Sequence, residues 1–249
     1  MTSDRSLLTV AIDTTSEIAG IALLEGDALL GEITWRSRQN HSRELLPTLE
    51  WLLQRSQRPK TDLGAVVVCL GPGSYAGMRV GVSTANALAY GLSVPIAGVG
   101  RLAADAYPFA AATPGRVIAV HAAGRADLAW GVYEALSPLT LTLSQGERGS
   151  ELLNLELREI EAPCLGPAAD LLTRVQPGDI VCGEIEKLRE ELRAALVERG
   201  ARLCQAHESR VLAVARLGLQ RLARGDIDNA DTLVPMYLRA PAIGPQQSP

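Results

Sequence analysis

The 249-residue chain lacks several features that would assign it to a particular class of protein. Phe, Trp and Tyr together make up only 4% of its residues, so its core must consist mainly of aliphatic side chains. No apolar run approaches the roughly 20 residues that a membrane-spanning helix needs. The N-terminal segment carries an acidic residue and too short an apolar run for a secretory signal. We therefore expect a soluble, cytoplasmic protein with no contact to a membrane.

Cysteine and positive charge are also scarce. The four cysteines lie far apart and form no C-x-x-C motif, which favours reduced structural thiols in the cytosol. The formal net charge is −4, and binding to nucleic acid depends largely on Lys and Arg neutralising phosphates. We therefore expect the lone chain to bind nucleic acid weakly and to need a partner that supplies basic surface.

Metal-ligand spacing is missing as well. The chain has only three histidines, His41, His121 and His207, and they are widely separated along the sequence. A lone histidine more often lies at a helix end or half-buried than in a site, so we favour a structural role for each. We expect no metal site.

The distribution of apolar segments predicts an α/β protein of two lobes. In the first lobe, residues 1–113, a strand meander is followed by alternating helices and strands on a mixed sheet. The second α/β lobe covers residues 114–206. A C-terminal helix and segment, residues 207–239, returns to the first lobe, and residues 240–249 form a loose tail. The expected strands are 7–13, two around the turn at 25–27, 65–70, 94–100, 116–123, 128–136, 139–146 and 179–183, and the expected helices are 41–56, 74–91, 101–111, 169–176, 186–200 and 209–226.

The stretch GPGSYAGMRVGVSTANALAYG, residues 71–91, carries three glycines in its first seven positions. It lacks the lysine of a P-loop, its third glycine comes one position late for the dinucleotide fingerprint, and Ser74 directly follows Gly73, unlike a nucleophile elbow. It follows an apolar β-branched strand, so it predicts a turn at Gly71 and Gly73 and a helix capped by Ser74. Two interpretations stay open, an anion-binding corner and a tight connection without a ligand, and local physics favours the second.

The same stretch closely resembles the TsaB (YeaZ) family, whose members carry Gly-Pro-Gly-Ser-aromatic-x-Gly-x-Arg-hydrophobic-Gly at this point. Arg79 stands in the arginine position. The opening LLTVAIDTTSEIAGIALLEGD, the segment NHSRELLPTLEWLL and the C-terminal PMYLR resemble the same family. The resemblance is strong over residues 7–105 and weak in the second lobe. Members often have Asp-Ala-Arg where this chain has His121-Ala122-Ala123, so no role is carried over to that position.

The resemblance implies an actin-like, ribonuclease H-like (ASKHA) fold of two α/β lobes. It also implies a role in making threonylcarbamoyladenosine beside the anticodon of certain tRNAs. In that pathway TsaB is the scaffold partner of the catalytic homologue TsaD, and the ATPase TsaE is the third member. We expect a heterodimer with TsaD and contact with tRNA only through the complex. When TsaD is absent, the chain can form a homodimer instead.

A comparison with TsaD indicates that the chain is not an enzyme. TsaD carries an Asn-His-x-x-x-His metal motif after a Pro-x-x-Gly-Val strand, and the matching positions here are Gly100, Arg101 and Asp105. Arginine cannot bind a metal because all of its nitrogens carry hydrogens and it stays charged. We therefore expect no catalytic residue and no cofactor, and no ATP hydrolysis or tRNA modification by the lone chain.

The turn Asp13, Thr14, Thr15 and Ser16 leaves an alternative open. In actin-like folds such a turn binds phosphate, with the aspartate holding Mg²⁺ through water. The other interpretation is that Asp13 ends a strand and the hydroxyl groups satisfy the turn, leaving a vestigial phosphate loop. The second is slightly favoured, and the alternative function is an actin-like ATPase or kinase-like enzyme.

Small residues recur every four positions along the helix from Ser74, which places them on one face. This face and the leucine face of the preceding helix form an expected partner interface, while the alternative is that the stripe packs on the chain's own sheet. The residues expected at the interface are Gly77, Gly81, Ala85, Ala89, Leu45, Leu49 and Leu52.

Overall fold

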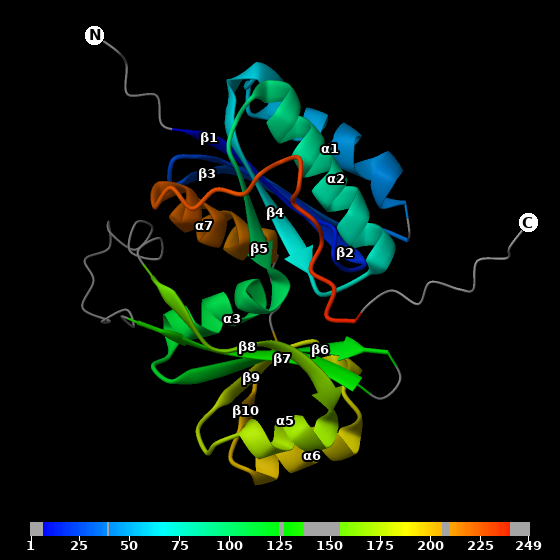
Figure 1. The fold of residues 1–249 in the computed structure, drawn as a ribbon, viewed down its shortest axis with the longest axis vertical. Helices are drawn as coiled ribbons and strands as arrows, with labels where there is room; N and C mark the ends of the chain where they lie inside the picture. The colour runs from blue at the N-terminus through cyan, green and yellow to red at the C-terminus, as the bar shows by residue number, and fades with distance from the viewer. Residues whose placement is uncertain (1–6, 39, 125–126, 137–154, 206–209, 240–249) are drawn as a thin grey trace, which may run out of the picture.

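The computed structural model describes residues 7–38, 40–124, 127–136, 155–205 and 210–239, and these form two α/β lobes (Figure 1). Each lobe is built on one five-stranded sheet, as the actin-like fold requires. None of the helices in these residues is long and apolar enough to cross a membrane.

The first sheet has the strand order β3-β2-β1-β4-β5. The meander β1–β3 is antiparallel, and β4 and β5 continue the sheet parallel to β1. The leucine face of α1 and the small-residue face of α2 cover one side of this sheet, and α7 covers the other. The bounds are β1 Leu8–Asp13, β2 Ile18–Glu25, β3 Ala28–Arg36, α1 His41–Arg55, β4 Leu63–Gly71, α2 Tyr75–Leu92, β5 Ile96–Gly100 and α7 Arg210–Ala223.

The second sheet has the order β10-β9-β6-β7-β8, and α5 and α6 cover its outer face. Helix α3 covers the inner face, so it lies between the two sheets in Figure 1. It also packs against α7 and the first sheet, and therefore belongs to both lobes. The bounds are α3 Arg101–Ala112, β6 Arg116–Ala123, β7 Asp127–Ala135, β8 Leu157–Pro167, α5 Ala168–Arg174, β9 Ile180–Gly183, α6 Glu190–Glu198 and β10 Arg202–Leu203.

The α/β architecture predicted from the sequence is confirmed, but three elements of the second lobe differ from the prediction. Strand β8 was not expected, because it is a partly exposed edge strand that contains prolines and lacks a clear alternation. The helix expected at 186–200 begins only at Glu190, since Ile185–Lys187 form a 3₁₀ turn. The two-residue strand β10 is too short to leave a pattern.

The lobe boundaries at residues 113 and 206 remain a proposal. Helix α7, which follows the second boundary, packs on β1, β4 and β5 of the first sheet. The strand expected at 139–146, His207 and the tail at 240–249 lie outside the described residues.

A candidate site between the two lobes

The strand β1 ends at Asp13, whose carboxylate is buried at the junction of the lobes. Its Oδ1 accepts hydrogen bonds from the backbone N of Thr15 at 2.9 Å and from Thr15 Oγ1 at 2.7 Å. The hydroxyl-rich turn therefore folds back on the aspartate that precedes it.

The other oxygen of Asp13 is held by Arg210, the first residue of α7. Arg210 Nε lies 2.7 Å from Asp13 Oδ2, and its Nη1 lies 3.1 Å from Oδ1 of Asp105. Its Nη2 donates to Ser16 Oγ at 3.0 Å. A guanidinium thus stands beside the carboxylate at the place where an actin-like phosphate loop would need a metal cation.

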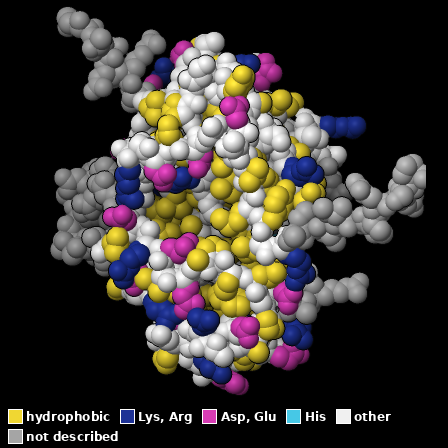
Figure 2. Space-filling model, in the orientation of Figure 1, with side chains coloured by type: hydrophobic (Ala, Val, Ile, Leu, Met, Phe, Trp, Pro, Cys, Tyr) yellow, Lys and Arg dark blue, Asp and Glu magenta, His cyan; other side chains and the backbone are white. Residues whose placement is uncertain are grey.

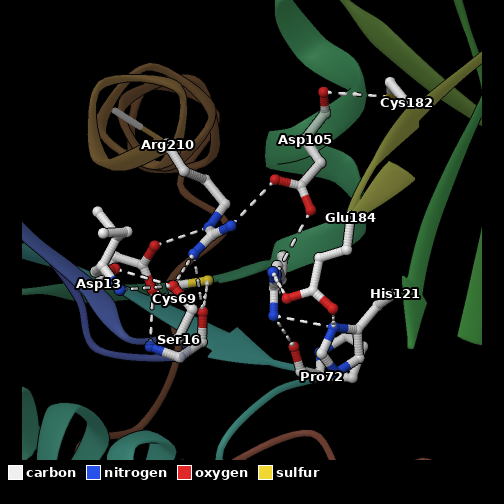
Figure 3. A network of polar contacts seen from close by, with 12 residues as sticks. Asp13, Ser16, Cys69, Pro72, Asp105, His121, Cys182, Glu184 and Arg210 are labelled. Atoms are coloured by element: carbon white, nitrogen blue, oxygen red, sulfur yellow. Dashed lines mark hydrogen bonds and ion pairs between the residues drawn. The ribbon is translucent and has the colours of Figure 1, made fainter. Parts of the chain in front are cut away.

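A second arginine, Arg101, continues the chain of charges toward the second lobe, because it pairs with Asp105 and Glu184, both labelled in Figure 3. Arg101 Nε lies 3.4 Å from Asp105 Oδ2 on the next turn of α3, and Arg101 Nη2 donates to Glu184 Oε1 at 2.9 Å. Glu184 follows strand β9, and its Oε2 lies 2.7 Å from Nδ1 of His121 on β6. Lys187 also donates to Glu184, at 2.7 Å.

We call this set the interlobe cluster. It links the end of β1, the helices α3 and α7 and the second sheet through alternating charges. Its members are Asp13, Arg210, Asp105, Arg101, Glu184 and His121.

The pairing sets the protonation of the buried acids. Burial raises the pKa of Asp13, but Arg210 and the hydrogen bonds from Thr15 outweigh it, so the net shift is downward. Burial likewise opposes ionisation of Glu184, yet the contacts with His121, Arg101 and Lys187 hold its pKa far below its usual range. Both acids are therefore ionised and paired near neutral pH.

Glu184→Gln tests this pairing through the pH dependence of stability. Because the folded-state pKa of Glu184 is depressed, its stabilisation is complete above the ordinary value of 4.5 and is lost as the pH falls below it. Between pH 6 and pH 3.5, we expect the stability advantage of the wild type over Glu184→Gln to shrink by about 1.4 kcal/mol. Urea unfolding at the two pH values measures this difference.

Glu17→Gln serves as the control for that measurement, since Glu17 is an exposed partner of Arg36. The stability advantage of the wild type over Glu17→Gln should change by less than about 0.5 kcal/mol between the same two pH values. Equal pH profiles for wild type and Glu184→Gln would contradict the assignment.

The glycine turn between β4 and α2 packs against the Asp13 turn. Gly71 has φ +103°, which favours glycine, and a Cβ on Gly73 would overlap the carbonyl oxygen of Thr15. The backbone N of Ser74 donates to that same oxygen at 2.8 Å, and Ser74 Oγ accepts from Gly77 N at 3.3 Å. The two loops thus hydrogen-bond to one another at the start of α2.

Arg79 points away from this turn. It donates to the hydroxyl of Tyr75 at 3.1 Å and lies over the ring of that exposed tyrosine. Its role in the structure is on the surface of α2, not in the turn or the helix cap.

The small-residue stripe of α2 faces the chain's own sheet, so the expectation that it forms a partner interface is wrong. All seven residues expected at a partner interface are buried inside the chain's own first lobe, where α1 and α2 cover the sheet. Gly77 and Gly81 pack directly against Thr14, and Ala85 and Ala89 belong to the core beneath α2. The glycines serve this internal contact, so a partner can meet only the opposite face of these helices.

Two of the three histidines, His41 and His121, lie within the described residues. His41 is buried at the start of α1 beside Gly77, and His121 pairs with Glu184. Among the described residues there is no group of three or more His, Cys, Asp or Glu side chains that could hold a metal ion. Arg101 and Asp105, at the positions of the TsaD histidines, form an ion pair with one another instead.

Two members of the interlobe cluster were missed by the sequence analysis. Arg210 could not be recognised from the sequence, because it is simply the first residue of an ordinary amphipathic helix. Glu184 could have been found, since it follows the buried strand β9 and the carboxyl ends of parallel strands commonly carry site residues.

The chemistry available to the cluster is limited. Its carboxylates are already paired with arginines, and the neighbouring Cys69 is a poor nucleophile because burial raises its pKa to about 12. The arrangement suits a fixed structural junction better than proton or phosphoryl transfer.

The two lobes, the sheet order and the site at their junction define an actin-like protein. The family model described as "TsaD: tRNA N6-adenosine threonylcarbamoyltransferase" matches residues 29–146. The solved structure of YeaZ from Pseudomonas aeruginosa is 25% identical, covers 93% of this chain and 100% of that chain, and gives a TM-score of 0.69.

Two curated relatives carry the name "tRNA threonylcarbamoyladenosine biosynthesis protein TsaB". The protein from Bacillus subtilis is 41% identical over 93 residues, 37% of this chain and 41% of its own length. The protein from Escherichia coli is 32% identical over 128 residues, 50% of this chain and 54% of its own length. The matched region thus spans about half the length of these relatives. Over the matched part, the chain is similar to the TsaB (YeaZ) family.

Proposed function

We propose that the chain is a non-catalytic scaffold subunit in the biosynthesis of threonylcarbamoyladenosine in tRNA. It would act in the cytoplasm, bind TsaD as a heterodimer and support it together with TsaE. The observation that carries the proposal is the interlobe cluster, in which the chain's own arginines pair the acids of the site. The names of the Bacillus subtilis and Escherichia coli relatives support the pathway.

The alternative, an actin-like ATPase or kinase, would need Asp13 to be free for a hydrated magnesium ion. Arg210 holds that carboxylate at 2.7 Å, and Thr15 occupies its other oxygen. This geometry argues for the scaffold and against a working phosphate loop.

Surface charge favours contact with tRNA through a complex. On the face in Figure 2, Lys and Arg side chains alternate with Asp and Glu over both lobes, and the described residues there form no large basic patch. Since tRNA binding depends on phosphate neutralisation, the basic surface would come from a partner.

The outer faces of α1 and α2 are the proposed contact for TsaD. Large apolar side chains are exposed there, among them Leu46 and Trp51 on α1 and Tyr90 on α2. Exposed aromatic and aliphatic residues on neighbouring helices suit a protein interface. The proposal also follows the family resemblance, which points to these elements.

Ala87→Trp tests this contact, because Ala87 is exposed in the middle of α2. A tryptophan there should weaken binding to TsaD at least about tenfold through steric overlap, while the melting temperature stays near that of the wild type. Ala169→Trp, on exposed α5 in the other lobe, should bind TsaD like the wild type. Titration calorimetry with purified TsaD measures both.

If the wild type binds TsaD and the folded Ala87→Trp variant binds it equally well, the α2 contact is refuted. Failure of the wild type itself to bind TsaD would refute the proposed function.

A further inference from the structure

The second sheet brings two of the four cysteines together. Strands β9 and β10 run parallel, with Ile180 opposite Arg202 and Val181 opposite Leu203. The backbone N of Cys204 donates to Val181 O at 2.9 Å, so the same register continues by one residue. Cys182 and Cys204 are therefore opposite one another on neighbouring chain segments.

Their side chains lie on the same face of the sheet. Residues in register on adjacent strands point to the same side, and both cysteines pack in the apolar cluster beneath α3. The Sγ of Cys182 donates to the backbone O of Asp105 on α3 at 3.4 Å (Figure 3). Burial, followed by the charges of Asp105 and Cys204, raises the pKa of Cys182.

The other two cysteines are placed differently. Cys69 lies in the core of the first lobe, and Cys164 lies on β8 opposite Trp130, against the outer core of the second sheet. All four are free thiols and all fall within the described residues, so Cys182 and Cys204 are the one adjacent pair.

We propose that Cys182 and Cys204 form an oxidisable dithiol that closes to a disulfide when the protein meets a hydroperoxide. Neighbouring strands lie about 4.7–4.9 Å apart, within the ~4.4–6.8 Å that separates the Cα atoms of disulfides. The strand β10 has only two residues and lies at the edge of the sheet, so a small shift can bring the two Cβ atoms to bonding distance.

The chemistry balances with hydrogen peroxide as the oxidant. Cys204 is only partly buried, so it is the thiol that peroxide reaches first. Its thiolate sulfur attacks one oxygen of the peroxide and becomes a sulfenic acid, the O–O bond breaks, and the hydroxide that leaves takes up the proton lost by the thiol as a first water. The sulfur of Cys182 then attacks the sulfur of Cys204, and the displaced hydroxide takes up the remaining thiol proton as a second water. One peroxide and two thiols give one disulfide and two waters.

Oxidation would reach the interlobe cluster through α3. The disulfide removes the S–H group that donates to the backbone of Asp105, and the side chain of Asp105 pairs with Arg101 and Arg210. The dithiol is thus one hydrogen bond away from the charges that join the lobes.

The test treats the reduced full-length protein with hydrogen peroxide, alkylates it in denaturant and maps the cysteines by peptide mass spectrometry. We expect two of the four thiols to become resistant to alkylation and a Cys182–Cys204 linked peptide to appear, with dithiothreitol restoring both thiols. Cys69→Ser and Cys164→Ser should still form the link. Cys204→Ser, at a partly buried position, should lose it, as should Cys182→Ser.

Several results would overturn the proposal. These are four alkylatable thiols after treatment, sulfinic acid on Cys204 without a link, or a link that joins another pair or two chains. The proposal would also be overturned if hydrogen peroxide still made two thiols of the Cys204→Ser variant resistant to alkylation.

Discussion

Arg210→Ala should lower the free energy of unfolding by about 3–5 kcal/mol, because it leaves the buried carboxylate of Asp13 without its cation and leaves Asp105 paired only with Arg101. The side chain of Asp13 is 2% exposed and that of Asp105 is 7% exposed, so water cannot replace the guanidinium. The measurement is equilibrium unfolding in urea at pH 7. The dependence of the unfolding free energy on urea concentration should match that of the wild type, which confirms that the same surface is exposed on unfolding.

Arg224→Ala is the matched control, since Arg224 forms an ion pair with Glu156 at the surface of the same C-terminal region. Exposed pairs contribute little, so we expect a loss of about 0–1 kcal/mol. Adding Asp13→Asn to Arg210→Ala should recover part of the loss, because one uncompensated charge is gone, and a coupling of about 1–3 kcal/mol is expected. A loss below about 1 kcal/mol for Arg210→Ala would show that the acids do not depend on it.

Gly77→Ala should destabilise the protein by about 3 kcal/mol, although helix propensity alone predicts a gain of about 1 kcal/mol. A Cβ on Gly77 would overlap the carbonyl oxygen of Thr14, which is backbone and cannot move aside like a flexible side chain. Thr14 also donates from its hydroxyl to the carbonyl of Gly77 at 2.7 Å, so the two segments are fixed to one another. Thermal and urea unfolding both measure this change.

Gly91→Ala, in the same helix, should change the free energy of unfolding in the opposite direction. A Cβ on Gly91 meets nothing within 4 Å, so only the propensity remains, and we expect a gain of about 0.5–1 kcal/mol. If both alanine variants were stabilised, the close contact between α2 and the Thr14 turn would be wrong.

The first lobe could be predicted well from sequence because its signals are local. A β-branched apolar run, a turn rich in glycine and a serine cap each specify their own structure, as seen in β4, Gly71 and Ser74. The TsaB resemblance falls on the same segments. The second lobe carried weaker patterns, and its exposed edge strand β8 was missed.

The interlobe cluster could not be read in the same way, because it joins residues that are far apart in the chain. Asp13 and Arg210 are separated by 197 positions and meet because α7 packs on the first sheet, and nothing local to either residue signals the pair. The stripe of Gly77, Gly81, Ala85 and Ala89 was visible as a close-contact face, but its periodicity does not say whether a sheet or another protein fills that face. Only the packing of Thr14 against it decides the question.

Helix α3 is packed on both sheets, and its charged residues are bonded toward either side. Rotation of one lobe against the other would have to break these buried bonds together. The surface of the molecule is therefore preorganised, so this chain would lose little conformational entropy when a partner docks on it. A partner of the kind proposed above would therefore dock on this chain nearly as on a rigid body.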